Sequence, residues 1–473
     1  MAQYAQADIE QLRARVEAVC HRVLGKGQVS GLRQLSGGAS MESWQFVFVD
    51  QRYILRRFPS LAAQHDFPEG VATVPLRDQA VLMQHASSRG VLVPEVIAIL
   101  EQDDAMGDGF IMACVEGEAL PQRLLADPSY ADAMASLSEH CARELARIHA
   151  IPIASLPVTL MVQTPRDALQ EQEHFYRAYG SHHPIYSLAL AWLSAHCPVA
   201  SSQVLLHGDF RLGNFLVDQR GLTSVLDWEL AHIGDPLQDI AFLCTPSWRF
   251  GRYQQEAGGF ASLEGWLADY ERAAGVEVSK VDLAWWLIFN TLWWGVTCMR
   301  MAGSYKDGSV ATMERAVIGR RISEVAIDLL LLLEPHRENV ASKIVISPPE
   351  VGAQESAITA RDLLLSVRDW NKIRLAEEAD QHRLFEGRVA NNAMGIVLRE
   401  LTLGGALRER AERRQQQLGA TDEEWSLRLG ESVAHFHHDA LWDHLRYSAI
   451  EALWIDQPHY AGLDAAVARW AAD

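Results

Sequence analysis

Residues 204–242 read VLLHGDFRLGNFLVDQRGLTSVLDWELAHIGDPLQDIAF, and the interpretation of the whole chain starts from this stretch. The apolar residues 204–206 are typical of a short strand, and a polar loop follows them as far as Asn214. Residues 215–226 alternate apolar side chains around a Gly-containing turn, which predicts a β-hairpin. A hairpin brings its two ends together, so we expect Asp209, Asn214 and Asp227 to converge.

This set of side chains suits the transfer of a phosphoryl group from ATP to an alcohol. Asp209 would orient the hydroxyl and accept its proton, while Asn214 and Asp227 would hold Mg²⁺ against the phosphates. Aspartate has an ordinary pKa of about 4 and is ionised at neutral pH. Arg211 lies between the base and the first metal ligand, where a cation meets the γ-phosphate or an anionic acceptor. The alternative for Arg211 is an exposed loop charge.

Four neighbouring residues have predicted supporting roles. We expect His207 to be structural and to bond the loop backbone. Glu229 is a candidate to support Mg²⁺ through water. Asp235 and Asp239 are expected to cap a helix and to brace the catalytic loop through hydrogen bonds.

The residues His207-Gly208-Asp209, Asn214 and Asp227 at these spacings resemble the aminoglycoside phosphotransferase-like kinases, relatives of the protein kinases. The longer segments HGDFRLGN and LDWELAHIGDPLQDIA resemble one branch, the kinases fused to or encoded beside acyl-CoA dehydrogenases. Some of these phosphorylate hydroxyacyl-CoA thioesters. The resemblance covers about residues 30–335 and implies an α+β, two-lobed protein-kinase-like fold, with a small β-rich N-lobe and a mainly helical C-lobe. It also implies ATP and Mg²⁺ as cofactors.

The N-lobe follows from the first part of the chain. Residues 8–24 have the apolar period of a helix. Ser36, Gly37, Gly38, Ala39 and Ser40 lie between two strand-like segments, which predicts a loop whose N–H groups lie over the ATP phosphates. An ordinary turn is the alternative.

Kinases of this type carry a lysine on the third strand, and this sequence has Arg56 there. Arginine can make a forked contact with phosphate oxygens, so the electrostatic role is retained. A solvated strand charge is the alternative. The helical partner of this residue is normally a glutamate; here the candidate is Asp78, with Glu69 as a second choice.

Residues 91–96 and 109–115 are predicted strands, and the second leads into the hinge between the lobes. The backbone groups of Ala113 and Val115 are expected to meet the adenine edge. The predicted boundaries are therefore 1–115 for the N-lobe and 116–338 for the C-lobe. His149, at the end of a predicted helix, is expected to be a core or capping residue.

The rest of the chain reads as helical. Residues 283–301 are strongly apolar but include Asn290 and Arg300, so we expect a core helix rather than a membrane span. The tryptophan pairs at 285/286 and 293/294 are expected in the core, with a cleft for an acyl chain as the alternative. Residues 339–354 break the pattern and predict a linker. Residues 355–473 predict an all-α accessory domain, which resembles a small helical protein found next to such kinases.

The composition of the chain bears on its number of domains, its ligands and its cellular compartment. A chain of 473 residues exceeds one compact core. A net charge of −19 argues against non-specific nucleic-acid binding, which needs a basic surface. Six cysteines without a CxxC pair predict reduced thiols in a cytoplasmic protein. No secretory leader opens the sequence.

The leading hypothesis is a Mg²⁺- and ATP-dependent kinase whose acceptor, from the resemblance, is a hydroxyacyl-CoA such as a 4-hydroxyacyl-CoA. An acyl-CoA dehydrogenase-like enzyme is the expected partner. One alternative is a kinase for an aminoglycoside, a choline-like molecule or a sugar. Another is a pseudokinase that acts as a scaffold, motivated by the arginine at position 56.

Overall fold

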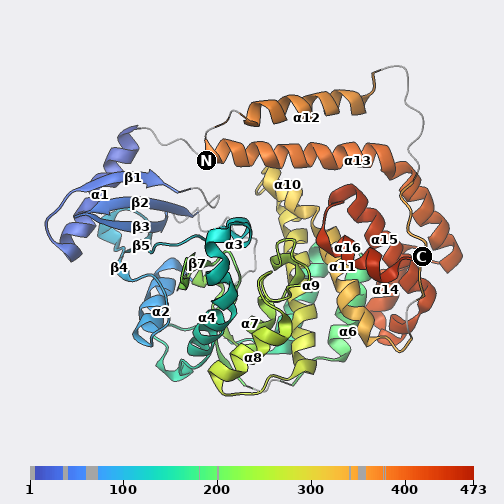
Figure 1. Cartoon of the computed structure of the whole chain (residues 1–473), viewed down its shortest axis with the longest axis horizontal. Helices are drawn as coiled ribbons and strands as arrows, with labels where there is room; N and C mark the ends of the chain where they lie inside the picture. Colours follow the sequence, from blue (N-terminus) through green and yellow to red (C-terminus); the bar gives the residue numbers. More distant parts are fainter. Residues whose placement is uncertain are drawn as a thin grey trace. The chain divides into compact units, whose positions relative to one another are not determined.

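The computed structural model describes residues 6–35, 41–59, 73–180, 182–199, 202–339, 342–349, 358–376, 378 and 380–472. The chain forms two compact units (Figure 1). The β-rich unit comprises Met1–Thr164, Ala200–Cys244 and Gln254–Leu283, and the helical unit comprises Pro165–Val199, Thr245–Tyr253 and Ala284–Asp473.

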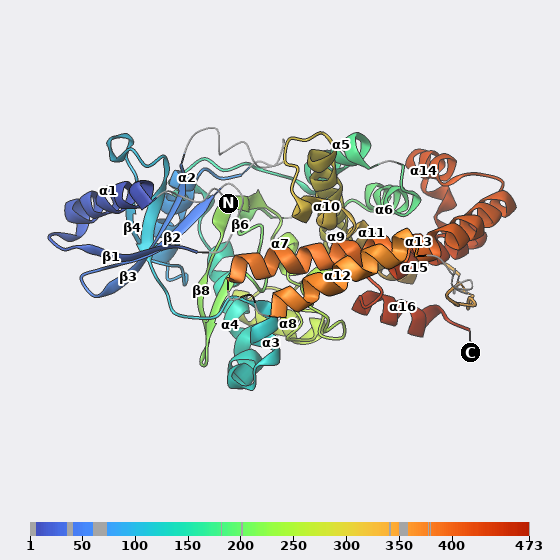
Figure 2. The same ribbon diagram turned by 90° about the horizontal axis from the view of Figure 1, so that it is seen from above.

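The β-rich unit begins with an antiparallel sheet in the order β1-β2-β3-β5-β4. Its strands are β1 (Val29–Gln34), β2 (Glu42–Phe48), β3 (Gln51–Phe58), β4 (Val96–Ile99) and β5 (Asp108–Ala113). Helix α1 (Gln6–Leu24) lies along the sheet (Figure 2) and buries Val16 and Val19 against Trp44, Phe46 and Leu55. Helix α2 (Leu76–Ser88) also packs on β4 and β5.

This packing determines where Arg56 points. Leu55 belongs to the apolar cluster under α1. Successive side chains of a strand point to opposite faces, so Arg56 lies on the face turned away from α1. From that face of β3 the Arg56 side chain reaches Asp227, at the end of the hairpin formed by residues 215–226.

Shorter elements complete the β-rich unit. They are α3 (Pro121–Ala126), α4 (Ala131–His149), β6 (Val204–Leu206), β7 (Phe215–Asp218), β8 (Gly221–Val225), β9 (His232–Gly234), α7 (Pro236–Phe242) and α8 (Leu263–Ala274). β6 pairs with β9, and β7 pairs with β8. The segment after β5 joins the hairpin, because Glu118 and Val217 exchange backbone hydrogen bonds of 2.9 and 3.0 Å.

The helical unit contains α5 (Pro165–Tyr179), α6 (Pro184–Ala195), most of α9 (Lys280–Lys306), α10 (Met313–Gly319), α11 (Ile322–Leu333), α12 (Ala360–Ala376), α13 (Gln381–Leu418), α14 (Asp422–Glu431), α15 (Asp439–Asp456) and α16 (Ala461–Trp470). α6 packs on α14, α11 packs on α15 and α16, and α12 lies beside α13 (Figure 1). The helical unit therefore joins the helices of the tail to helices that fall within the predicted C-lobe, namely α5, α6, most of α9, α10 and α11.

Several predictions about elements are confirmed. The helix over 8–24, the hairpin over 215–226 and the helices of the tail are all present. The strand predicted over 91–96 is wrong, because β4 begins only at Val96. Pro94 lies within the predicted strand and has no N–H to donate to a neighbouring strand. The predicted linker is attached to the helical unit at Ile344. The Ile344 N–H donates to the Trp470 carbonyl oxygen, and the Ile344 carbonyl oxygen accepts the Ala472 N–H.

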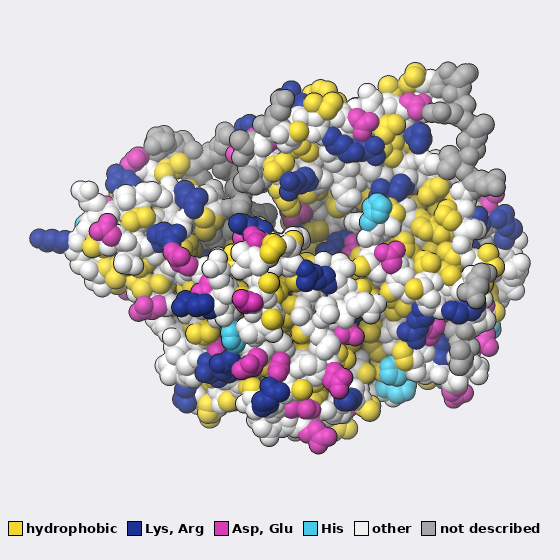
Figure 3. Space-filling model, in the orientation of Figure 1, with side chains coloured by type: hydrophobic (Ala, Val, Ile, Leu, Met, Phe, Trp, Pro, Cys, Tyr) yellow, Lys and Arg dark blue, Asp and Glu magenta, His cyan; other side chains and the backbone are white. Residues whose placement is uncertain are grey.

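The apolar stretch at 283–301 lies within α9, and Trp285 and Trp286 are buried against Phe289. They pack in the core, as predicted. Among the described residues, no helix combines the length and the apolar character needed to cross a membrane. All six cysteines are free thiols. On the face drawn in Figure 3, basic and acidic side chains are interspersed.

Candidate active site

The loop between β6 and β7 brings two of the predicted residues into direct contact. The Asn214 amide nitrogen donates to the Asp209 carboxylate at 2.5 Å and to the Asp209 carbonyl oxygen at 2.9 Å. The Leu226 N–H donates to the Asn214 carbonyl oxygen at 2.8 Å, which places Asp227 next to this pair. Because the Asn214 nitrogen is engaged by Asp209, the amide oxygen is the atom left to accept a cation.

Asp227 is held in an uncommon conformation at the end of the hairpin. Its φ of 59° and ψ of 71° lie in the left-handed region, which a non-glycine residue rarely adopts. One nitrogen of Arg56 lies 2.5 Å from the Asp227 carboxylate. Burial acts to raise the pKa of Asp227, but the charge and hydrogen bond of Arg56 outweigh it and hold the pKa below its ordinary range. Asp227 is therefore an ionised carboxylate.

Arg56 provides the test of whether this site fits a nucleotide and its metal ion. Its side chain is only 9% exposed, so the alternative of a solvated strand charge is wrong. Its Nε is buried and has no hydrogen-bond partner among the described residues. A buried guanidinium with an unused donor, beside an amide oxygen and an ionised carboxylate, fits a phosphate anion and Mg²⁺.

The predicted pair of Arg56 with Asp78 is not found among the described residues, where Arg56 pairs with Asp227. Asp78 lies in the first turn of α2, near Asp108. Burial raises the pKa of Asp108, and the Asp78 charge adds to that shift. The aspartate arm is one methylene shorter than the usual glutamate. Glu69 lies outside the described residues, as do Ser36, Gly37, Gly38, Ala39 and Ser40.

Arg211 is bound to the candidate base. Its Nε donates to the Asp209 carboxylate at 2.8 Å, and its side chain is 26% exposed, which is less than a solvated loop charge would be. Burial raises the pKa of Asp209, although Arg211 opposes the shift. Burial and the charges of Asp227 and Asp209 raise the pKa of Glu229 to about 7. Three carboxyl groups are therefore close enough to influence one another.

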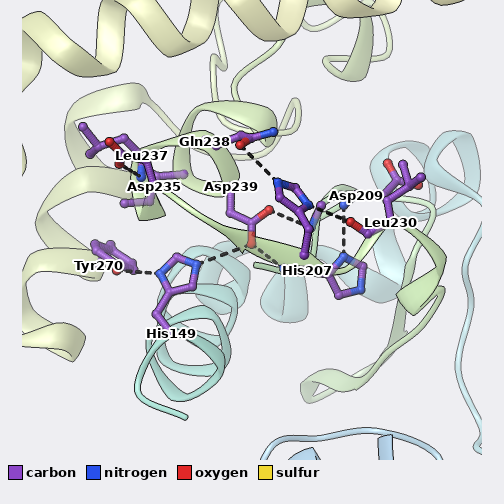
Figure 4. A network of polar contacts seen from close by, with 12 residues as sticks. His149, His207, Asp209, Leu230, Asp235, Leu237, Gln238, Asp239 and Tyr270 are labelled. Carbon is purple, nitrogen blue, oxygen red and sulfur yellow. Dashed lines mark hydrogen bonds and ion pairs between the residues drawn. The ribbon is translucent and has the colours of Figure 1, made fainter. Parts of the chain in front are cut away.

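A second group of residues holds the loop from behind (Figure 4). The buried Asp239 accepts the N–H of His207 at 2.7 Å and the N–H of Gly208 at 2.9 Å. Asp235 caps α7 by accepting the Leu237 N–H at 2.9 Å. The predicted capping and bracing roles of these two aspartates are confirmed.

The bracing extends to residues that the sequence did not indicate. His149 Nε2 lies 3.4 Å from Asp239, and its Nδ1 lies 2.8 Å from the Tyr270 hydroxyl (Figure 4). With Nε2–H donating to the carboxylate, Nδ1 accepts the Tyr270 proton. His149 is a core residue, as expected, but no local pattern marks Tyr270, which lies 121 positions later.

Steric constraints explain why position 208 of the loop is a glycine. Gly208 has a φ of +81°, and a β-carbon there would lie 2.2 Å from the Leu230 carbonyl oxygen. Only glycine fits this backbone. His207 is structural, as predicted: its Nε2 lies 2.8 Å from the Leu226 carbonyl oxygen, and burial lowers its pKa.

At the predicted hinge, one backbone group of Ala113 already has a hydrogen-bond partner. Its N–H donates to the Glu95 carbonyl oxygen at 2.8 Å, and the next N–H, of Cys114, donates to Arg52 at 3.0 Å. A contact of Ala113 with adenine would therefore use its carbonyl oxygen. The roles of Ala113 and Val115 stay predictions.

Comparisons with known proteins give two family matches. Residues 31–276 match the model described as the phosphotransferase enzyme family. Residues 377–460 match DUF6285, a domain of unknown function. The second match lies within the helices α13, α14 and α15 and the segments around them.

Two curated relatives carry similar names. The chain is 26% identical over 226 residues to acyl-CoA dehydrogenase family member 10 of Mus musculus, which is 45% of this chain and 20% of the relative. It is 27% identical over 267 residues to acyl-CoA dehydrogenase family member 11 of Pongo abelii, which is 53% of this chain and 33% of the relative. The chain thus spans a third or less of the length of these relatives.

A solved structure shares the fold. A proposed aminoglycoside phosphotransferase from Ralstonia eutropha JMP134 superposes with a TM-score of 0.54 at 21% identity, covering 66% of this chain and 95% of that one. The predicted α+β, protein-kinase-like fold is confirmed. With more than half of its residues matched by the family model, the chain belongs to the phosphotransferase enzyme family.

Proposed function

We propose that the chain is a kinase that uses ATP and Mg²⁺ to phosphorylate an alcohol. The observation that carries this proposal is the contact of Asp209 with Asn214 beside the ion pair of the buried Arg56 with Asp227. A scaffold needs none of these four residues in contact. Each of them has a distinct task in phosphoryl transfer, where positioning and charge supply most of the catalysis.

The residues divide the work as follows. Asp209 would orient the acceptor hydroxyl and take its proton, while Arg211, now bound to Asp209, would turn to the transferred phosphoryl group or an anionic acceptor. Asn214 and Asp227 would hold Mg²⁺, which neutralises charge on the phosphates when bound. The unused Nε of Arg56 would bond phosphate oxygens. Residues 36–40 over the phosphates, and the backbone of Ala113 and Val115 at adenine, complete the proposed nucleotide site.

For the acceptor we propose a hydroxyacyl-CoA. The support is the similarity to two proteins named as acyl-CoA dehydrogenase family members. Phosphorylation replaces hydroxide, a poor leaving group, with phosphate, a good one. A dehydrogenase-like partner enzyme would then complete the elimination. The fold is shared with an aminoglycoside phosphotransferase-like protein, so other small alcohols belong in the test.

The test is a product screen by mass spectrometry. The full chain is incubated with ATP, Mg²⁺ and hydroxyacyl-CoAs that differ in chain length and hydroxyl position, beside an aminoglycoside, choline and a sugar. The expected product is a phosphorylated thioester, formed only with ATP and Mg²⁺. Phosphorylation of one of the other alcohols alone would overturn the acceptor assignment. Nucleotide binding without any product would favour the scaffold.

A further inference from the structure

The helical unit contains a pocket that the phosphotransferase site does not use. It has a volume of about 260 Å³ and lies between α13, α15 and residues 345–347. Arg410, Arg413 and Arg414 of α13 line it at spacings of three and four, so they share one helix face. Tyr447 and Trp454 of α15 line it from the other side. They are seven positions apart and also share a face.

The charge of this pocket differs from that of the whole chain. The chain has 42 basic and 61 acidic residues, yet the charged residues that line the pocket, among those the structure describes, are three arginines and one carboxylate, Glu451. Arg414 lies 2.5 Å from Glu451, and their side chains are 16% and 7% exposed, so this pair forms part of the wall. The other two arginines give the pocket its positive charge.

Arg410 and Arg413 keep hydrogen-bond donors for a ligand. Arg410 gives one nitrogen to the Ser347 carbonyl oxygen at 2.8 Å. Arg413 is 62% exposed, and one of its nitrogens lies 3.9 Å from the carboxylate of Glu409. A guanidinium has five N–H groups, so neither side chain is saturated by these contacts. Each guanidinium is a planar fork of N–H groups that suits phosphate oxygens, and both arginines line this pocket.

The aromatic side chains add a second requirement. Trp454 and Tyr447 are partly exposed where they line the pocket. The Arg414 guanidinium lies 5.3 Å from the centre of the Tyr447 ring, which leaves the indole of Trp454 as the aromatic surface for a ligand. Planar rings stack on such surfaces. A ligand that joins phosphate groups to a planar ring meets both requirements.

We propose that this pocket binds the nucleotide end of a coenzyme A thioester, with Arg410 and Arg413 on its phosphates and Trp454 against its adenine. The inference rests on the proposed function, because a hydroxyacyl-CoA acceptor brings this group with it. The volume lies below the range of about 300–1,000 Å³ for pockets that enclose whole ligands, so the pocket would take one end of the molecule.

Isothermal titration of the full chain with coenzyme A, without ATP, tests the proposal. Arg413→Ala and Trp454→Leu should each weaken binding about 10-fold, because a charge-assisted hydrogen bond and the stacking of a base on an aromatic ring each contribute about that much. Arg408→Ala is the matched control, because Arg408 is an exposed residue of α13 that does not line the pocket. It should leave the affinity unchanged. Removal of the 3′-phosphate from coenzyme A should also weaken binding.

Four results of the titration would contradict the assignment of coenzyme A to this pocket. Equal affinity in wild type and both variants would show that coenzyme A binds elsewhere. No binding to the wild type would show that coenzyme A is not a ligand of the chain. Inorganic phosphate that binds as tightly as coenzyme A would show an anion site only. ATP binding that Arg413→Ala weakens as much as it weakens coenzyme A binding would show a second nucleotide site. The titration involves no turnover, so binding that depends on Arg413 without any phosphotransfer would contradict only the proposed function. Phosphotransfer to a thioester with affinity unchanged in Arg413→Ala would contradict only the pocket.

Discussion

Arg56 stands where related kinases carry lysine, and its neighbours explain how arginine serves there. It is buried, it pairs with Asp227, and its Nε has no hydrogen-bond partner in the part of the chain that the structure describes. Lysine is a point charge with a single nitrogen and cannot bond the carboxylate and a phosphate through a planar fork. The arginine therefore links β3 to the candidate metal ligand, and its guanidinium is the group proposed to meet the nucleotide.

Replacing Arg56 should affect nucleotide binding more than the chemical step. Arg56→Lys is expected to raise the KM for ATP about 10-fold with a smaller change in kcat. Arg56→Ala removes this partner of Asp227 and should lower stability by less than the about 3–5 kcal/mol of a fully buried pair, because the Asp227 side chain is 36% exposed. Steady-state kinetics and urea unfolding measure these effects. The control is Arg52→Ala, an exposed arginine of the same strand; an equal effect there would contradict the assignment.

Tyr270 is expected to position the catalytic loop without touching substrate. Tyr270→Phe removes only the hydroxyl that bonds His149, so the hold of His149 on Asp239 should loosen. We expect kcat to fall about 3- to 10-fold while the KM for ATP stays the same, a loss of about 0.7–1.4 kcal/mol in transition-state stabilisation. Tyr130→Phe, outside this network, is the control. A change in KM alone would show that Tyr270 acts on nucleotide binding instead.

The site shows what a sequence reveals at the scale of residues. Asp209, Asn214 and Asp227 were predicted together because a hairpin, a local structure, connects them. The contact of Arg56 with Asp227 joins residues 171 positions apart, and the spacing of neither segment indicates it. The same holds for Tyr270 and His149. The predicted partner of Arg56, Asp78, is wrong for this reason. It was inferred from the helical partner in related kinases, whereas the observed partner, Asp227, is distant in sequence.

At the scale of elements, the helical unit contains a buried carboxyl group that should make its stability depend on pH. Asp328 of α11 accepts the hydroxyls of Tyr253 at 3.1 Å and Tyr460 at 2.5 Å. Burial raises the pKa of Asp328 to about 7. In the unfolded chain the pKa is about 4, so between these values the folded state holds a proton that the unfolded state does not. The free energy of unfolding must therefore fall as pH rises from about 4 to 7.

Asp328→Asn should remove this dependence, because the amide does not ionise. The slope attributable to Asp328 is at most about 1.4 kcal/mol per pH unit. Urea unfolding at several pH values, compared between wild type and variant, measures it. Asp464→Asn, at an exposed position of α16, should leave the slope unchanged. Identical slopes in wild type and Asp328→Asn would show that Asp328 is ionised in the folded chain throughout this range.

The elements themselves were largely predictable, because periodicity is local. The helix over 8–24 and the hairpin over 215–226 follow from apolar spacing alone. The start of β4 did not, since a run of apolar residues around Pro94 resembles a strand although the proline cannot complete the ladder. The packing of α6 on α14 was also beyond reach, because it joins parts of the chain that are more than 200 residues apart.

At the scale of the whole molecule, the last three helices, α14, α15 and α16, are packed parts of the helical unit. α14 covers α6, while α15 and α16 cover α11. A chain that ends at residue 349 would expose the apolar faces of α6 and α11 to water. We expect such a chain to aggregate or to unfold at a lower temperature, measured by light scattering and thermal melting. A monomeric truncated chain with unchanged kinetics would contradict this account of the helical unit.

The central claim is that Asp209 drives phosphoryl transfer in a site shared with Asn214 and Asp227. The direct measurement is the rate of ATP-dependent phosphorylation of the best acceptor by wild type, Asp209→Asn and Asp218→Asn. Asp218 is a carboxylate of the same hairpin, bound to Arg220 at the turn, and serves as the control. The account predicts that Asp209→Asn lowers kcat by about 10²- to 10⁴-fold and that Asp218→Asn leaves it within about twofold of wild type. Equal rates for Asp209→Asn and wild type would contradict it.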